Sequence, residues 1–159
     1  MSNFSPMLKY TWIIIKHKYF LLKIGRRLGV PYYRLLKHDL SKFSWKELPH
    51  YARQFCGDKS DQPSFMRAWL HHQNSNDHHW EYWINRSVYH KDKGDCDTID
   101  MSDAAIREMI ADWLAASRAY SGFWPASLDK WTWYQDKWNK IHLSSDTKQK
   151  VLDILITLF

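Results

Sequence analysis

The stretch "SDAAIREMIADWLAASRAY", residues 102–120, holds the clearest helix pattern in the chain. Ser102 is a favoured helix N-cap, and no glycine or proline interrupts the residues that follow. Side chains suited to packing recur three and four positions apart, which is the spacing of one helix face. This face consists of Ile106, Met109, Ile110, Trp113, Ser117 and Tyr120. The pattern predicts a long helix packed against a core.

Similar patterns on both sides of this stretch predict more helices. Residues 7–28 form one pattern that ends at Gly29, and another begins at Pro31 and runs to about Lys42. Strand signals are weak, because β-branched residues do not alternate with polar ones. Further helices are expected over residues 45–55, 63–72, 78–83, 127–141 and 145–158, with turn chemistry at 73–77 and a solvated loop at 90–100. We therefore expect an all-α fold, with residues 1–159 forming a single-domain helical bundle.

The composition restricts the classes of function and of partner that fit the sequence. The formal charge of +6 and the pI near 9.3 favour anionic partners such as nucleotides or nucleic acid. Cys56 and Cys96 lie far apart and form no C-x-x-C motif, so a cytoplasmic protein without disulfides is expected. The apolar stretch at 12–24 is interrupted by Lys16 and Lys18, so neither a membrane span nor a signal peptide is predicted. The sequence does not indicate an oligomeric state.

His17 falls in the middle of the apolar line of the first predicted helix. Projection at about 100° per residue places it among Tyr10, Ile13, Leu21 and Ile24. The imidazole is therefore expected to point toward the core. A histidine in that position either forms a hydrogen bond to a backbone carbonyl or binds a metal ion.

The second predicted helix has Tyr32, Leu35, Leu36 and Phe43 on its buried side, and Asp39 of "LLKHDLSKF", residues 35–43, is expected to project among them. A buried carboxylate needs a cation, because an unpaired buried charge costs several kcal/mol. Lys42, three positions later, could supply that cation in an intrahelical ion pair. A metal ion shared with the neighbouring His38 is the alternative.

Asp112 lies on neither the apolar nor the charged side of its helix. Its neighbours on that flank are Ala105, Ala116 and Ala119, whose small side chains allow another element to approach closely. An aspartate facing such a groove needs a buried hydrogen-bond donor or a metal ion.

Four histidines occur within nine positions of "HHQNSNDHHWEYW", residues 71–83. This density is typical of a metal-binding segment, although histidines in a polar connection can also cap backbone carbonyls. The aromatic residues that follow either stack on a ligand or belong to the core. Both interpretations remain open from the sequence.

Taken together, these residues resemble the HD-domain superfamily of metal-dependent phosphohydrolases. "HDLSKF" is similar to the H-D-x-x-K signature of that superfamily, and the chain order of an early histidine, the doublet, further histidines and a late aspartate agrees. Residues 8–155 also resemble a family of small phage and bacterial proteins that share "HDLSKF", "HH…HH-x-EYW" and "DW-x-AAS" and carry no assigned function.

The resemblance implies one or two divalent transition-metal ions, Mn, Fe, Co, Ni or Zn, and a nucleotide or related phosphate ester as substrate. The implied metal ligands are His17, His38, Asp39, His71, His79 and Asp112. The implied catalytic residues are Asp39, Lys42 and Glu81, the last by orienting a histidine. The implied substrate contacts are Lys42, His72, His78 and His79. In this scheme a water activated by the metal attacks phosphorus, and Lys42 meets the phosphate.

Two other functions remain open at this stage. Some relatives of the superfamily use a di-iron centre for oxygenation, and the histidine content here permits that chemistry. A basic, tryptophan-rich nucleic-acid-binding protein is the second alternative, with Lys130, Lys137 and Lys140 interleaved with Trp131 and Trp133. The H-D-x-x-E-D form linked to alarmone hydrolysis is absent, whereas nucleoside monophosphates, deoxynucleoside triphosphates and cyclic nucleotides all remain candidate substrates.

Overall fold

The computed structural model describes residues 5–85 and 97–159, and this part of the chain is all-α, as predicted. A single pair of two-residue strands accompanies the helices, with Ile84 opposite Thr98 and Asn85 opposite Asp97. The α-helices are α1 (Pro6–Arg27), α2 (Tyr32–Lys37), α3 (Leu48–Cys56), α4 (Gln62–Ser75), α5 (Asp103–Ser121), α6 (Thr132–Lys137) and α7 (Ser145–Leu158). Short 3₁₀ helices are η1 (Leu40–Phe43), η2 (Trp80–Trp83) and η3 (Trp138–Lys140), and the strands are β1 (Ile84–Asn85) and β2 (Asp97–Thr98).

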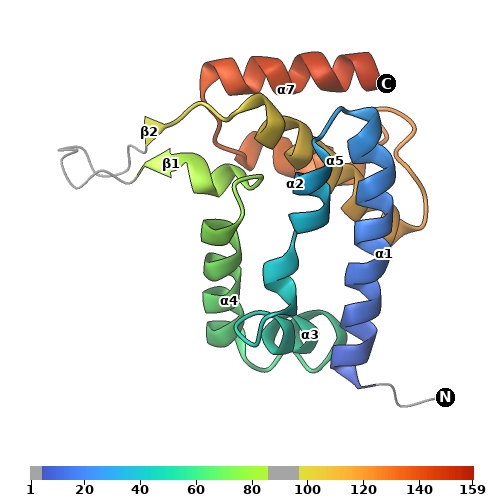
Figure 1. The fold of residues 1–159 in the computed structure, drawn as a ribbon, viewed down its shortest axis with the longest axis vertical. Helices are drawn as coiled ribbons and strands as arrows, with labels where there is room; N and C mark the ends of the chain where they lie inside the picture. The colour runs from blue at the N-terminus through green and yellow to red at the C-terminus, as the bar shows by residue number, and fades with distance from the viewer. Residues whose placement is uncertain (1–4, 86–96) are drawn as a thin grey trace.

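Helix α1 passes through two hydrophobic clusters. Its first half contributes Tyr10 and Ile14 to a cluster with α3 and α4, and its second half contributes Leu21 and Ile24 to a larger cluster with α5 and α7. His17 lies between these pairs on the same buried face, as predicted. In Figure 1, α1 and α4 stand on either side of the α2 and η1 segment, and α3 lies across the bottom.

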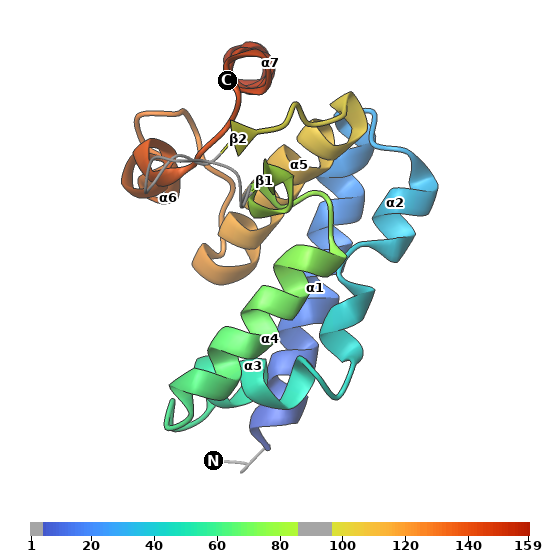
Figure 2. The ribbon, with the colours of Figure 1, turned by 90° about the vertical axis from the view of Figure 1, so that its left-hand side faces the viewer.

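Helix α5 packs along α1 (Figure 2). The Ser102 side chain caps it, accepting a hydrogen bond from the Ala105 backbone amide, and Gly122 ends it in the left-handed conformation. The apolar face predicted from the sequence is buried from Ile106 to Trp113. Tyr120 was expected on the same face but is 60% exposed, one residue before the end of the helix.

The predicted continuous helix from Pro31 to about Lys42 is wrong. Helix α2 ends at Lys37, Asp39 has a left-handed backbone with φ of 56°, and η1 follows. Aspartate is one of the few residues that adopt this conformation readily. The break turns both His38 and Asp39 inward, so that both are buried. Three residues predicted on the buried side of that helix are exposed instead: Tyr32, Leu36 and Phe43.

The second half of the chain differs from the predicted boundaries in four places. The helix expected over 78–83 is the 3₁₀ helix η2, which begins at Trp80. Helix α4 continues through residues 73–75, which were expected to form a turn. The helix expected over 127–141 is the shorter α6 followed by η3. Of the loop expected at 90–100, residues 90–96 lie outside the described residues, and 97–98 form β2. Among the described helices, none combines the length and apolar character needed to cross a membrane.

Candidate metal centre

The two carboxylate oxygens of Asp39 face two different groups of side chains. Asp39 Oδ1 lies 3.2 Å from His72 Nε2 and 3.5 Å from His78 Nε2. Asp39 Oδ2 lies 2.5 Å from Lys42 Nζ, 3.4 Å from His38 Nε2 and 3.8 Å from His17 Nε2. A fully buried carboxylate is therefore shared between two clusters of nitrogen donors.

The first cluster combines four residues from three parts of the fold. His17 comes from the middle of α1, His38 and Asp39 from the break after α2, and Asp112 from α5. Asp112 Oδ1 lies 3.0 Å from His17 Nε2 and 3.4 Å from His38 Nε2. One donor atom from each residue lies within 4.8 Å of all the others, so the four could hold one metal ion.

The second cluster shares Asp39 with the first. His72 on α4, together with His78 and His79 before η2, completes it, and the four donor atoms again lie within 4.8 Å of one another. Three imidazoles and one carboxylate form a donor set typical of transition metals rather than of Mg²⁺ or Ca²⁺.

Unpaired buried atoms support metal binding at the second cluster. Asp39 Oδ1 and the Nε2 atoms of His72, His78 and His79 are buried and have no hydrogen-bond partner among the described residues. Such atoms are rare in folded proteins, because leaving one unpaired costs about 1–3 kcal/mol. A metal ion bound between the four atoms would satisfy all of them. The residues present therefore fit the expected cofactor.

Burial keeps two of these histidines in the form that binds metals. Desolvation, together with the neighbouring His38, lowers the pKa of His78. Desolvation and the neighbouring His78 and His72 lower the pKa of His79 well below its usual range. Both imidazoles are therefore neutral at pH 7, as a metal ligand must be.

A buried carboxylate on α5 contacts one histidine from each cluster. Glu108 Oε1 lies 2.8 Å from His38 Nδ1 and 3.4 Å from His78 Nδ1. Burial opposes ionisation of Glu108, but hydrogen bonds from these two histidines hold its pKa well below the usual range. Arg34 donates from Nε to Glu108 Oε2 at 2.5 Å and also pairs with Asp77. Contacts of this kind fix the ring orientation of metal-binding histidines.

Glu47 contacts a histidine of the second cluster in the same way. Its Oε2 lies 2.9 Å from His72 Nδ1, and its Oε1 lies 2.7 Å from His71 Nδ1. Glu47 precedes α3 and is fully buried. Each cluster therefore has carboxylate support behind its imidazoles.

Five of the six predicted metal ligands lie in the two clusters, and His71 does not. His17, His38, Asp39 and Asp112 form the first cluster, and His79 belongs to the second. His71, predicted as a ligand, lies outside both clusters, and its side chain is 35% exposed. His72 and His78, predicted as substrate contacts, take ligand positions instead. The difference between His71 and His72 arises because successive side chains on a helix point about 100° apart.

The two other predicted catalytic residues lie beside the clusters. Lys42 donates to Asp39, as the ion-pair interpretation required, and it also lines the adjacent pocket. Glu81 lines the same pocket, with Oε2 at 3.9 Å from His79 Nδ1 and no hydrogen-bond partner for that oxygen in the described chain. The expected orienting hydrogen bond from a histidine to the Glu81 carboxylate is therefore not formed among the described residues.

The sequence patterns do not predict Arg34, Glu47 and Glu108 as residues of the site. A signal was present for Glu108, which precedes Asp112 by four residues and so lies on the same side of the helix. Glu47 and Arg34 carried no such signal, because a glutamate before a helix and an arginine in a short helix usually face solvent. Only the packing of distant elements brings them to the histidines.

A pocket of about 490 Å³ opens onto both clusters. His17, Asp39, His79 and Asp112 lie in its wall together with Lys42. Its volume is within the range of about 300–1,000 Å³ that is typical of small-molecule sites. Four tryptophans also line the pocket: Trp69, Trp80, Trp113 and Trp133. Metal donors, a cation and aromatic rings thus face one space.

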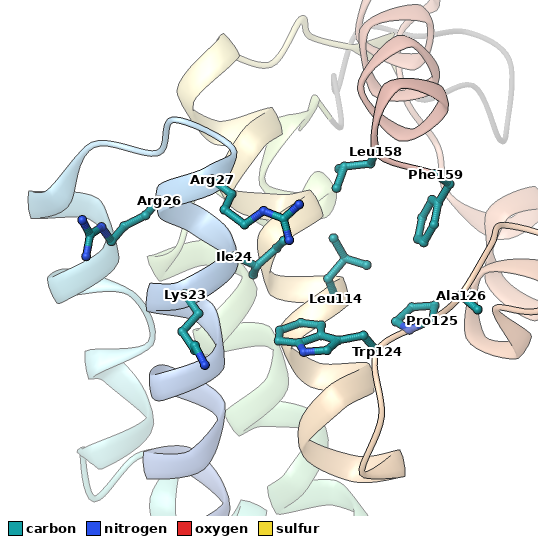
Figure 3. A pocket seen from close by; sticks show the side chains of 10 residues that line it. All are labelled: Lys23, Ile24, Arg26, Arg27, Leu114, Trp124, Pro125, Ala126, Leu158 and Phe159. Carbon is teal, nitrogen blue, oxygen red and sulfur yellow. The ribbon is translucent and has the colours of Figure 1, made fainter.

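A larger cavity of about 720 Å³ lies elsewhere, between the end of α1, α5 and the end of α7 (Figure 3). Basic side chains of α1 form one side, and Trp124, Pro125 and Phe159 lie across from them. No histidine or acidic side chain is among the described residues that line it. We therefore place the candidate site in the smaller pocket, which contains the donor atoms.

Comparison with protein families assigns most of the chain. Residues 7–157 match the model of a family of unknown function (DUF5662). The chain belongs to this family. The match covers every element of both clusters, from α1 to α5, so the candidate centre lies within the DUF5662 region. No curated protein and no solved structure matches the chain significantly.

Proposed function

We propose that this DUF5662 protein is a metal-dependent phosphohydrolase with a two-ion centre that acts on a nucleotide or a related phosphate ester. The observation that supports it best is the shared position of Asp39, whose two oxygens belong to two separate sets of donors. A carboxylate placed in this way can bridge two ions, and paired ions are a recurrent arrangement in enzymes that cleave phosphate esters.

The donor types favour Mn, Fe, Co, Ni or Zn. The two clusters contain five histidines and Asp112 in addition to the shared Asp39, a mixture that suits these metals better than Mg²⁺. When bound, such ions would supply a polarised phosphoryl oxygen and a water that is deprotonated near neutral pH.

Lys42 would assist by its charge. Its ammonium group lies beside Asp39 and faces the pocket, so it can stabilise negative charge on the non-bridging phosphate oxygens. Glu81 Oε2 has no partner in the described chain and also faces the pocket, where it can accept a hydrogen bond from a substrate hydroxyl or a water. The surrounding tryptophans provide flat apolar surfaces for a nucleobase.

The oxygenase alternative shares the same donors, because histidine and carboxylate also suit iron. Oxygen consumption by the iron-loaded protein would separate it from hydrolysis. The nucleic-acid-binding alternative required exposed aromatic rings on the C-terminal segment. Trp131 and Tyr134 are buried in the main hydrophobic cluster, which leaves them unable to stack on single-stranded bases.

Metal analysis of the purified, untagged protein tests the proposal. We expect up to two equivalents of a transition metal by inductively coupled plasma mass spectrometry, and loss of bound metal in Asp39→Ala. Asp129→Ala removes an exposed aspartate outside the pocket and serves as the control. The loaded protein should release phosphate from members of a nucleotide panel, and Asp39→Ala should release none. A protein that binds no metal after reconstitution with each candidate ion would refute the proposal.

A further inference from the structure

The pocket over the candidate centre contains two lysines that take no part in the metal clusters. Lys137 at the end of α6 and Lys140 in η3 both line it. Neither forms an ion pair with any residue that the structure describes, whereas Lys42 in the same pocket is paired with Asp39. The two lysines thus bring positive charge to the pocket without a described protein counter-charge.

Aromatic side chains connect the metal clusters to these lysines. Trp113 follows the ligand Asp112 directly, and its ring centroid lies 5.1 Å from that of Trp133. Trp133 precedes Lys137 by four residues on α6, so both side chains lie on the same side of that helix. The pocket wall therefore runs from metal donors through two indole rings to a pair of cations.

This order of groups matches the chemistry of a particular ligand. A phosphate at the metal clusters would place an attached aromatic ring along Trp113 and Trp133, where stacking is favourable. A second anion beyond that ring would meet Lys137 and Lys140 and form charge-assisted hydrogen bonds. A monophosphate would leave both lysines without a partner among the described residues.

We propose that the substrate is a nucleotide with two separated phosphate groups, the second of which is bound by Lys137 and Lys140. The inference rests on the proposed phosphohydrolase function, since it takes the metal clusters as the site of the first phosphate. Both a nucleoside 3′,5′-bisphosphate and the phosphorylated end of a short oligonucleotide carry this chemistry.

Isothermal titration calorimetry with defined probes tests the assignment. Adenosine 3′,5′-bisphosphate and adenosine 5′-monophosphate are titrated into the metal-loaded protein and, to exclude turnover, into the EDTA-treated protein. The bisphosphate should bind about tenfold more tightly than the monophosphate, because the second phosphate gains charged hydrogen bonds. Lys137→Gln/Lys140→Gln should abolish this difference and leave monophosphate affinity nearly unchanged.

A second double variant that removes the same amount of positive charge controls for a general loss of electrostatic attraction to the ligands. Lys9→Gln/Lys130→Gln removes two exposed lysines outside the pocket and should retain the preference for the bisphosphate. The inference is overturned if the wild-type protein shows no preference, or if both double variants weaken the two ligands alike. A 5′-phosphorylated diadenylate that binds more tightly than the bisphosphate would assign the second phosphate to an oligonucleotide, and weaker binding would assign it to a free nucleotide.

The outcomes separate this inference from the proposed function. If metal binding and phosphate release are found but the lysine substitutions do not change the ligand preference, only the two-phosphate assignment fails. If the lysine-dependent preference is found in the EDTA-treated protein while no metal or turnover is detected, the hydrolase proposal fails and the lysine site stands as a binding site.

Discussion

At the scale of single residues, Glu108 connects the two clusters of candidate metal ligands. Its Oε1 contacts His38 of the first cluster and His78 of the second, and Arg34 holds its other oxygen. Glu47 contacts the second cluster alone, through His72. Substituting each glutamate separately therefore distinguishes an effect on both clusters from an effect on the second cluster alone.

Glu108→Gln is expected to weaken metal binding at both clusters. The substitution removes the anionic acceptor behind one imidazole of each set, and changes of this kind lower metal affinity about 10–100-fold. Metal titration against a competing chelator would measure both binding steps. Glu47→Gln should weaken only one step. An equal effect of both substitutions on a single step would contradict the shared role of Glu108.

His71 and His72 provide a second prediction at this scale. His72→Ala should remove one metal equivalent, because His72 Nε2 faces Asp39 from within the second cluster. His71→Ala should retain both equivalents, since His71 lies outside the clusters and contacts only Glu47 among the donors. Elemental analysis of the two variants checks this. Loss of metal in His71→Ala alone would show that the sequence-based choice of His71 was right.

At the scale of elements, close packing of α1 and α2 positions the His38-Asp39 break. A Cβ atom on Gly25 would overlap the end of the buried Leu35 side chain, so a larger residue at this position would force Leu35 to shift. The backbone amide of Val30 also donates to the Gly25 carbonyl, which fixes the turn between the helices. The break after α2 is thereby held against α1, where His17 lies.

Gly25→Val is expected to lower the free energy of unfolding by about 2 kcal/mol, because overpacking a filled site typically costs about 1–3 kcal/mol. Urea denaturation monitored by tryptophan fluorescence measures the change. In a Leu35→Ala background the same substitution should cost clearly less, since the overlapping atoms are gone. An identical cost in both backgrounds would mean that helix packing at this position is not the cause.

At the scale of the whole molecule, the candidate centre joins elements from most of the chain. Its donors come from α1, the break after α2, α4, the segment before η2, and α5. Without a metal ion, several buried nitrogen and oxygen atoms in the described part of the fold have no hydrogen-bond partner. Metal binding should therefore contribute to the stability of the entire fold.

Removal of metal with EDTA is expected to lower Tm by about 5–10 °C, because a ligand at about 100 times its Kd stabilises the folded state by about 2.7 kcal/mol. Differential scanning calorimetry measures the shift, and adding back the metal should reverse it. The Asp39→Ala variant should show no response to EDTA. A wild-type Tm that is independent of EDTA would contradict a structural contribution from the metal.

The sequence by itself determined the all-α class, the long helices α1 and α5, and the inward direction of His17. It also singled out Asp39 as a carboxylate among apolar residues, Asp112 as a carboxylate beside small alanine side chains, and His38 as the neighbour of Asp39 in the sequence. All three signals are local properties of the sequence. Only the tertiary structure decided that α2 ends before the doublet, that His72 rather than His71 faces Asp39, and that Glu47 and Glu108 stand behind the histidines. These features depend on the left-handed backbone at Asp39 and on the rotation of α4, which are set by packing between elements far apart in the chain.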